Sequence, residues 1–123
     1  MQTRKYIAVV DDDESVREAL PDLLREFGYE AGGFSSAEEF LASDKFKQAE
    51  GLVLDIAMPG MSGLDLQREL IRRERKLPIV FITAYNEQAA RLRSREQGAV
   101  ECLLKPFSDT ELAEALQAVL KSN

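Results

Sequence analysis

The sequence of 123 residues predicts a single doubly wound α/β domain, a mostly parallel five-stranded sheet with helices on both faces. Three observations predict this fold. Five short strand candidates recur along the chain, helical patterns separate them, and the connections are short. The length suits one hydrophobic core, and no repeat, linker or low-complexity stretch divides the sequence.

Four of the strand candidates are short apolar runs, which are typical of strands buried on both faces of a parallel sheet. They cover Tyr6–Val10, 52–54, 79–82 and 102–104. The fifth, Glu30–Phe34, alternates less clearly, so we place it nearer an edge of the sheet.

The helices are predicted from apolar spacing and from capping residues. The clearest stripe comprises Val16, Ala19, Leu20, Leu23, Leu24 and Phe27. Gly28 follows where a helix C-terminal glycine belongs, and Pro21 inside the stripe should kink or loosen the helix. Capping-box spacing starts two more helices, at Ser36 with Glu39 and at Ser108 with Glu111, ending near Ser43 and Lys121. Helices over 64–75 and 86–97 complete the series.

Composition excludes several classes of function. The apolar runs are too short for a signal peptide or a membrane span. The chain has no His and a single Cys, which removes Ser-His and Cys-His catalysis, an internal disulfide and the usual zinc ligands. We therefore expect a reducing, cytoplasmic setting. A net charge of -6 argues against broad DNA binding by this domain.

Chemically capable residues follow the predicted central strands. The first strand leads into Asp11, Asp12, Asp13 and Glu14, the third ends at Asp55, the fourth at Thr83, and Lys105 follows the fifth. Ligands of open α/β sheets bind beyond the carboxyl ends of the strands, so these side chains should gather. We interpret Asp13 and Glu14 as complementing the positive end of the next helix.

Three carboxylates at one sheet edge repel one another, by about 1 to 4 kcal/mol per close pair at surface-like dielectrics. A hard divalent cation such as Mg²⁺ accepts an open cluster of oxygen ligands, and Lys105 offsets further charge. A carboxylate neutralised in this way can attack a phosphoryl donor, with the Thr83 hydroxyl donating to a phosphoryl oxygen.

Four segments together resemble bacterial two-component response-regulator receiver domains of the CheY-like superfamily, and in particular its FixJ-like branch. They are Val9-Val10-Asp11-Asp12-Asp13, the run from Leu54 to Gly63, Ile82-Thr83-Ala84 and Lys105-Pro106-Phe107. The resemblance covers nearly the whole chain and implies a flavodoxin-like (βα)5 fold. It assigns residues 1–123 to one receiver domain, with no effector domain in this chain.

The resemblance also implies roles for individual residues. Asp55 accepts a phosphoryl group from a sensor histidine kinase, while Asp11, Asp12, Asp55 and the Ala57 carbonyl hold Mg²⁺ or Mn²⁺. Lys105, Thr83 and the adjacent Ala84 contact the phosphoryl group or carry the switch. The expected chemistry is self-phosphorylation and autodephosphorylation, not enzymatic turnover.

The switch is expected to remodel the surface formed by the 86–97 helix, the 102–104 strand and the last helix. By the resemblance it controls dimerisation and a linked transcriptional effector domain, with no direct nucleic acid or membrane contact by this domain. Cys102 stands where the family often has an aromatic residue, so Tyr85 is a substitute candidate. We interpret Cys102 as a small core residue, with a redox sensor as the alternative. Arg91, Arg93 and Arg95 form a solvated face or a charged partner surface.

Other interpretations stay open at this point. The Asp11–Ser15 stretch loosely resembles haloacid-dehalogenase-type phosphatases, in which Asp11 would be the nucleophile. A flavin or nucleotide binder is disfavoured because carboxylates stand where a phosphate cradle needs glycines. Within the receiver class, the chain fits a single-domain relay protein or, as the FixJ-like segments favour, a piece of a longer regulator.

Overall fold

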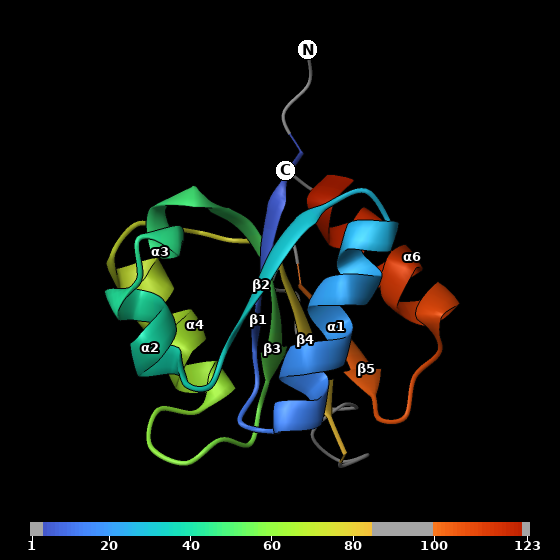
Figure 1. Cartoon of the computed structure of the whole chain (residues 1–123). Helices are drawn as coiled ribbons and strands as arrows, with labels where there is room; N and C mark the ends of the chain where they lie inside the picture. The colour runs from blue at the N-terminus through green and yellow to red at the C-terminus, as the bar shows by residue number, and fades with distance from the viewer. Residues whose placement is uncertain (1–3, 85–99, 122–123) are drawn as a thin grey trace.

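A central parallel sheet lies between two layers of helices in the computed structural model, which describes residues 4–84 and 100–121 (Figure 1). The strands are β1 Tyr6–Val10, β2 Glu30–Phe34, β3 Ala49–Asp55, β4 Ile79–Thr83 and β5 Val100–Leu104. All pairings among these described strands are parallel, in the order β2-β1-β3-β4-β5. The predicted parallel sheet, with Glu30–Phe34 at an edge, is confirmed.

The helices cover both faces of the sheet. Those described are α1 Glu14–Glu26, α2 Ala37–Ala42, α3 Lys45–Gln48, α4 Gly63–Arg72 and α6 Asp109–Lys121. Helices α1 and α6 lie on one face, and α2, α3 and α4 lie on the other (Figure 1). The helix predicted over 86–97 lies outside the described residues. Within the described ranges, no helix is both long enough and apolar enough to cross a membrane.

The alternation of side chains along β1 divides the core into two clusters. Ile7 and Val9 pack with α1 and α6, whereas Ala8 and Val10 pack with the helices of the opposite face. Every residue of β1 is buried, as a central strand covered on both sides requires. This double burial explains why the sequence shows apolar runs at the central strands.

Helix α1 follows the predicted stripe with one exception. Leu20 and Leu24 are buried, but Ala19 is exposed, so the buried face is narrower than predicted. Pro21 is buried inside α1 without ending it. Gly28 adopts a φ of 100° directly after the helix, a conformation that residues with a Cβ rarely adopt.

The two predicted capping boxes differ. Ser108 and Glu111 exchange both bonds, with the Ser108 N–H donating to Glu111 Oε1 at 2.8 Å and the Glu111 N–H donating to Ser108 Oγ at 3.0 Å. Ser36 accepts from the Glu39 N–H at 3.0 Å, but the Glu39 carboxylate accepts from Ser35 instead. The capping box at Ser36 is therefore only half formed, because the Glu39 carboxylate accepts from the Ser35 N–H and hydroxyl and not from the Ser36 N–H.

The region after α4 differs from the predicted helix over 64–75. Helix α4 ends at Arg72, and Glu74 adopts a φ of 58°. The chain thereby turns so that Arg75 lies against the separate turn α3, which the sequence did not predict. Arg75 Nη2 donates to the carbonyls of Phe46, Lys47 and Ala49. This long-range contact outweighs the local tendency to continue the helix.

Candidate functional site

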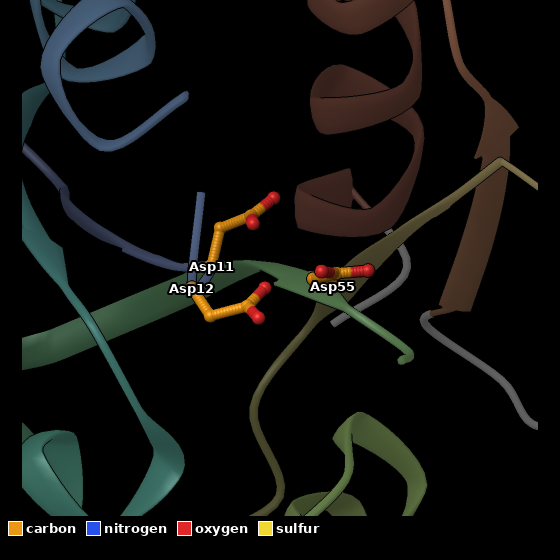
Figure 2. Close-up of side chains that lie close together, drawn as sticks. All are labelled: Asp11, Asp12 and Asp55. Atoms are coloured by element: carbon orange, nitrogen blue, oxygen red, sulfur yellow. The ribbon is translucent and has the colours of Figure 1, made fainter. Parts of the chain in front are cut away.

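The structure brings Asp11, Asp12 and Asp55 together at the carboxyl edge of the sheet (Figure 2). One carboxylate oxygen from each residue lies within 4.8 Å of the others. β1 pairs with β3, so residues that follow these two strands meet at one edge. Asp11 and Asp55 are buried, whereas Asp12 is exposed, which leaves the cluster open on one side.

Asp11 is held on all sides. Its backbone N–H donates to the Phe34 carbonyl at 3.1 Å, and its Oδ1 accepts from the Asp13 N–H at 2.9 Å. Lys105 Nζ forms an ion pair with Asp11 Oδ2 at 3.2 Å. The strand pairing positions this lysine, because the Lys105 N–H donates to the Thr83 carbonyl at 2.7 Å. The described site thus has a cation beside one carboxylate, as the sequence predicted.

Among the described residues, Asp55 is the carboxyl group whose environment most opposes a negative charge. Burial first, and the neighbouring Asp11 second, raise the pKa of Asp55 to about 7, while Lys105 and the Ala57 N–H act in the other direction. That N–H donates to Asp55 Oδ1 at 3.3 Å. A fully ionised Asp55 at neutral pH therefore requires a further positive charge at the cluster.

Thr83 ends the strand next to β3 and is 1% exposed. β4 pairs with β3 through Asp55 and Ile82, so Thr83 lies one residue beyond the level of Asp55. Ala84 follows and is exposed. Both therefore lie at the same edge as the carboxylates. Tyr85, Arg91, Arg93 and Arg95 lie outside the described residues.

Cys102 lies in β5 and is 2% exposed. It belongs to the core cluster that packs against α2 and α4. This burial is what a small core residue requires, and it withholds the thiol from solvent oxidants.

The loop between β3 and α4 approaches the site closely. A Cβ added at Gly63 would lie 2.4 Å from the Asp55 carbonyl oxygen and 3.0 Å from the Ile56 Cα. Gly60 adopts a φ of 74°, and the neighbouring Met61 N–H donates to Glu38 Oε2 at 3.3 Å. Helix α2 therefore contacts the loop that contains Ala57.

Sequence reasoning missed Arg17 and Glu38 as neighbours of the site. Arg17 Nη1 donates to the Asp11 carbonyl at 3.1 Å, and Glu38 accepts from Met61. The sequence held a signal for Arg17. A cation near the start of a helix is unfavourable beside the positive end of the helix dipole, so its presence there indicates a separate role. Glu38 gave no comparable signal, since an acidic residue suits the first turn of α2.

A model of the response regulator receiver domain matches residues 7–117. The chain belongs to this family. Nodulation protein W of Bradyrhizobium diazoefficiens is 43% identical over 116 residues, covering 94% of this chain and 51% of that protein. Response regulator protein TodT of Pseudomonas putida is 42% identical over 116 residues, with the same shares of the two chains covered.

Solved receiver structures support the same assignment. The response regulator StyR superposes with a TM-score of 0.85 at 43% identity, covering 98% of this chain and 61% of that one. The structure named FixJ-N gives a TM-score of 0.82 at 33% identity, covering 98% of this receiver domain and 96% of that chain. The flavodoxin-like fold and the FixJ-like resemblance are thereby confirmed.

The family settles the class of function. This chain is a receiver domain of two-component response regulators, which are signalling proteins and not classical enzymes. The phosphatase interpretation is not favoured, and its nucleophile Asp11 is fully buried with both carboxylate oxygens engaged. The chain spans about half the length of the curated relatives it matches.

Proposed function

We propose that residues 1–123 form a phosphoacceptor domain in which Asp55 takes a phosphoryl group from the phosphohistidine of a sensor kinase. The observation that carries this proposal is the Asp55 carboxyl, which is buried near Asp11 and Lys105 at an open edge of the sheet and has a raised pKa. An Asp55 oxygen attacks phosphorus, the bond from phosphorus to the histidine nitrogen breaks, and the histidine leaves. Water later hydrolyses the acyl phosphate and restores the carboxylate.

The donor set fits a hard divalent cation, Mg²⁺ or Mn²⁺. All three candidate side-chain ligands are carboxylates, and each offers one oxygen within 4.8 Å of the other two. We propose Asp11, Asp12, Asp55 and the Ala57 carbonyl as ligands. When bound, the cation supplies positive charge to the attacking carboxylate and to the phosphoryl oxygens.

Lys105 and Thr83 supply the remaining contacts in the proposal. Lys105 lies beside Asp11 and lowers the pKa of Asp55 against the larger effects of burial and Asp11, so its charge reaches the acceptor. Its ammonium would pair with a phosphoryl oxygen, and the Thr83 hydroxyl would donate to another. The added charge of about -1.5 to -2 draws both groups toward Asp55. Ala84, the exposed residue after Thr83, would move with it.

The proposed output surface includes β5, α6 and the segment 86–97. Its described part contains a groove of about 230 Å³ between β5 and α6. Three acidic residues line it, Glu101, Glu111 and Glu114, beside Leu103, Ala115 and Ala118. The sequence supplies opposite charge at Arg91, Arg93 and Arg95. This complementarity supports a homodimer formed on phosphorylation, with Tyr85 contributing to the coupling.

In the complete regulator we propose a linked DNA-binding effector domain, as the names of transcriptional regulators among the relatives suggest. The receiver itself would make no direct nucleic acid contact, because its net charge is -6. Signalling of this kind takes place in the cytoplasm.

The test is labelling with Mg²⁺ and acetyl phosphate, followed by intact mass and peptide mapping. One phosphoryl group per chain should appear on Asp55, and both Asp55→Asn and removal of Mg²⁺ should abolish it. Asp44→Asn is the matched control, because Asp44 is exposed and its side chain caps no helix. Labelling that persists in Asp55→Asn, or repeated turnover of a phosphate monoester that Asp11→Asn abolishes, would refute the proposal.

A further inference from the structure

The two carboxylates that follow β1 are held in different ways. Asp11 has a partner at each oxygen, the Asp13 N–H and the Lys105 ammonium. Across residues 4–84 and 100–121, no hydrogen bond or ion pair holds the Asp12 carboxylate, which is exposed. Figure 2 shows both side chains directed toward the side where Asp55 lies. Among the described residues, the restraint on Asp12 is therefore the backbone on either side of it.

Arg17 fixes that backbone. Its Nη1 donates to the Asp11 carbonyl at 3.1 Å, and this carbonyl belongs to the planar peptide group that joins Asp11 to Asp12. The Arg17 N–H also donates to the Asp13 carbonyl at 3.1 Å. One residue of α1 thus binds the turn on both sides of Asp12. Because the peptide is rigid, holding its oxygen fixes the plane that leads into Asp12 and so restricts the directions open to the Asp12 side chain.

Packing of α1 on the edge strand keeps Arg17 in place. A Cβ added at Gly33 of β2 would lie 2.9 Å from the Arg17 carbonyl oxygen and 3.3 Å from the Arg17 Cβ. Glycine therefore allows the helix backbone to approach the strand at this residue. The position of the guanidinium depends on that close approach.

The electrostatic position of Arg17 is unusual for a first-turn residue. A cation there opposes the helix dipole, so it needs compensation. Donation from the Ser35 hydroxyl and amide lowers the pKa of Glu39, and the nearby Arg17 guanidinium lowers it further. Glu39 thus supplies compensating charge.

We propose that Arg17 is a positioning residue for the metal site, and that its hydrogen bond to the Asp11 carbonyl aims Asp12 at the bound cation. The proposal rests on the proposed function, since it requires the aspartates to bind Mg²⁺. In this role Arg17 would hold the exposed ligand Asp12 in its binding orientation before the metal binds. Arg17 touches neither the metal nor the phosphoryl group.

A purely electrostatic role predicts the opposite sign. If Arg17 acted only as a positive charge beside the aspartates, removing it would strengthen binding of a cation. If Arg17 positions Asp12, removing it weakens binding although one positive charge is lost. The sign of the change in Mg²⁺ affinity therefore separates the two roles.

The experiment uses the full chain and the variants Arg17→Met, Arg17→Lys and Arg25→Met. Methionine keeps the length and packing of the stem without a donor or a charge. Arg25 is the matched control, because it lies on the same helix and also donates to a backbone carbonyl, that of Ala31. Calorimetric titration gives the Mg²⁺ affinity, and acetyl phosphate labelling gives the Mg²⁺ concentration for half-maximal rate. Urea unfolding without Mg²⁺ measures the fraction folded.

We expect Arg17→Met to weaken Mg²⁺ binding about tenfold, the lower end of the effects seen when a metal ligand loses its support. The labelling rate at saturating Mg²⁺ should stay within about twofold, a split that loss of fold would not produce. Arg17→Lys should lie between Arg17→Met and the wild type, because it keeps one donor. Arg25→Met should match the wild type in Mg²⁺ affinity.

A second variant tests the same step without changing charge. Gly33→Ala should push α1 away from β2 and weaken Mg²⁺ binding in the same direction. Affinity in Arg17→Met equal to or tighter than in the wild type would overturn the positioning role and leave the proposed function standing. Failure of the wild type itself to bind Mg²⁺ would overturn both.

Discussion

The two ends of the sheet satisfy their polar groups in opposite ways. At the amino end, Arg75 Nη2 donates to the carbonyls of Phe46, Lys47 and Ala49 at 3.3, 3.0 and 2.5 Å. At the carboxyl end, Asp11, Asp12 and Asp55 lie close together, and among the described residues Lys105 forms an ion pair with Asp11 of this cluster. One end places a cation among neutral acceptors, and the other gathers like charges.

This difference separates a structural contact from a functional one. The Arg75 contact joins α3 and the start of β3 to the segment after α4. Three backbone carbonyl dipoles compensate the positive charge of Arg75. The aspartate cluster keeps Asp55 partly protonated near neutral pH, because burial and Asp11 raise its pKa to about 7. Such a cluster lowers the stability of the metal-free fold and prepares it for a cation.

The largest effect should follow from adding a methyl group under the phosphoacceptor loop. Gly63→Ala places a Cβ 2.4 Å from the Asp55 carbonyl oxygen, so the backbone must shift. We expect a loss of about 3 kcal/mol in the free energy of unfolding, measured by urea denaturation. Gly28→Ala is the control, because an added Cβ meets no atom within 4 Å and only the positive φ is strained. A smaller loss in Gly63→Ala than in Gly28→Ala would contradict the tight approach.

Breaking the contact at the amino end should affect stability alone. Arg75→Met removes a charged donor from three carbonyls, and we expect a loss of about 2 kcal/mol in the free energy of unfolding. The Mg²⁺ affinity should not change. Arg68→Met is the control, since its ion pair with Asp65 is exposed and should contribute little to stability. Equal losses in the two variants would show that the Arg75 contact has no special weight.

Removing the buried charge should stabilise the metal-free protein. The folded pKa of Asp55 is about 7, above an unfolded value of about 3.9. Protonated Asp55 therefore contributes its full stabilisation to the folded state below about pH 4, and this contribution is lost as pH rises through about 7. At pH 8 with EDTA, Asp55→Asn should be more stable than the wild type by on the order of 1 kcal/mol.

The difference in unfolding free energy between these two proteins, followed by urea denaturation from about pH 4 to about pH 8, measures this effect. The free energy of unfolding of Asp55→Asn should rise relative to that of the wild type as pH rises, and added Mg²⁺ should reverse this difference. A difference that stays constant with pH would mean that Asp55 has an ordinary pKa.

The smallest effect should come from the contact between α2 and the phosphoacceptor loop. Glu38→Gln keeps an acceptor for the Met61 N–H but removes its charge. We expect a change below about 0.5 kcal/mol in stability and at most a twofold slower labelling by acetyl phosphate. Glu18→Gln, exposed on α1, serves as the control. A tenfold slower reaction would instead place Glu38 among the residues that organise the site.

Much of the fold could be predicted because the signals are local. Apolar runs marked the central strands, and capping residues marked the starts of α2 and α6. Two failures involved a remote partner, Arg75, which contacts α3 and follows the end of α4 at Arg72, and a third was a choice between local partners, in which Glu39 accepts from Ser35. Each is decided by a contact that competes with the local preference.

The sequence by itself determined which chemical groups stand at the carboxyl edge, because parallel strands point the same way and each central strand leads into a polar residue. Only the tertiary structure decided that β1 lies beside β3, which places Asp11 within reach of Asp55. It also decided which carboxyl is desolvated and which arginine supports the turn. Burial and long-range hydrogen bonds depend on elements far apart in the chain, and no pattern of neighbouring residues encodes them.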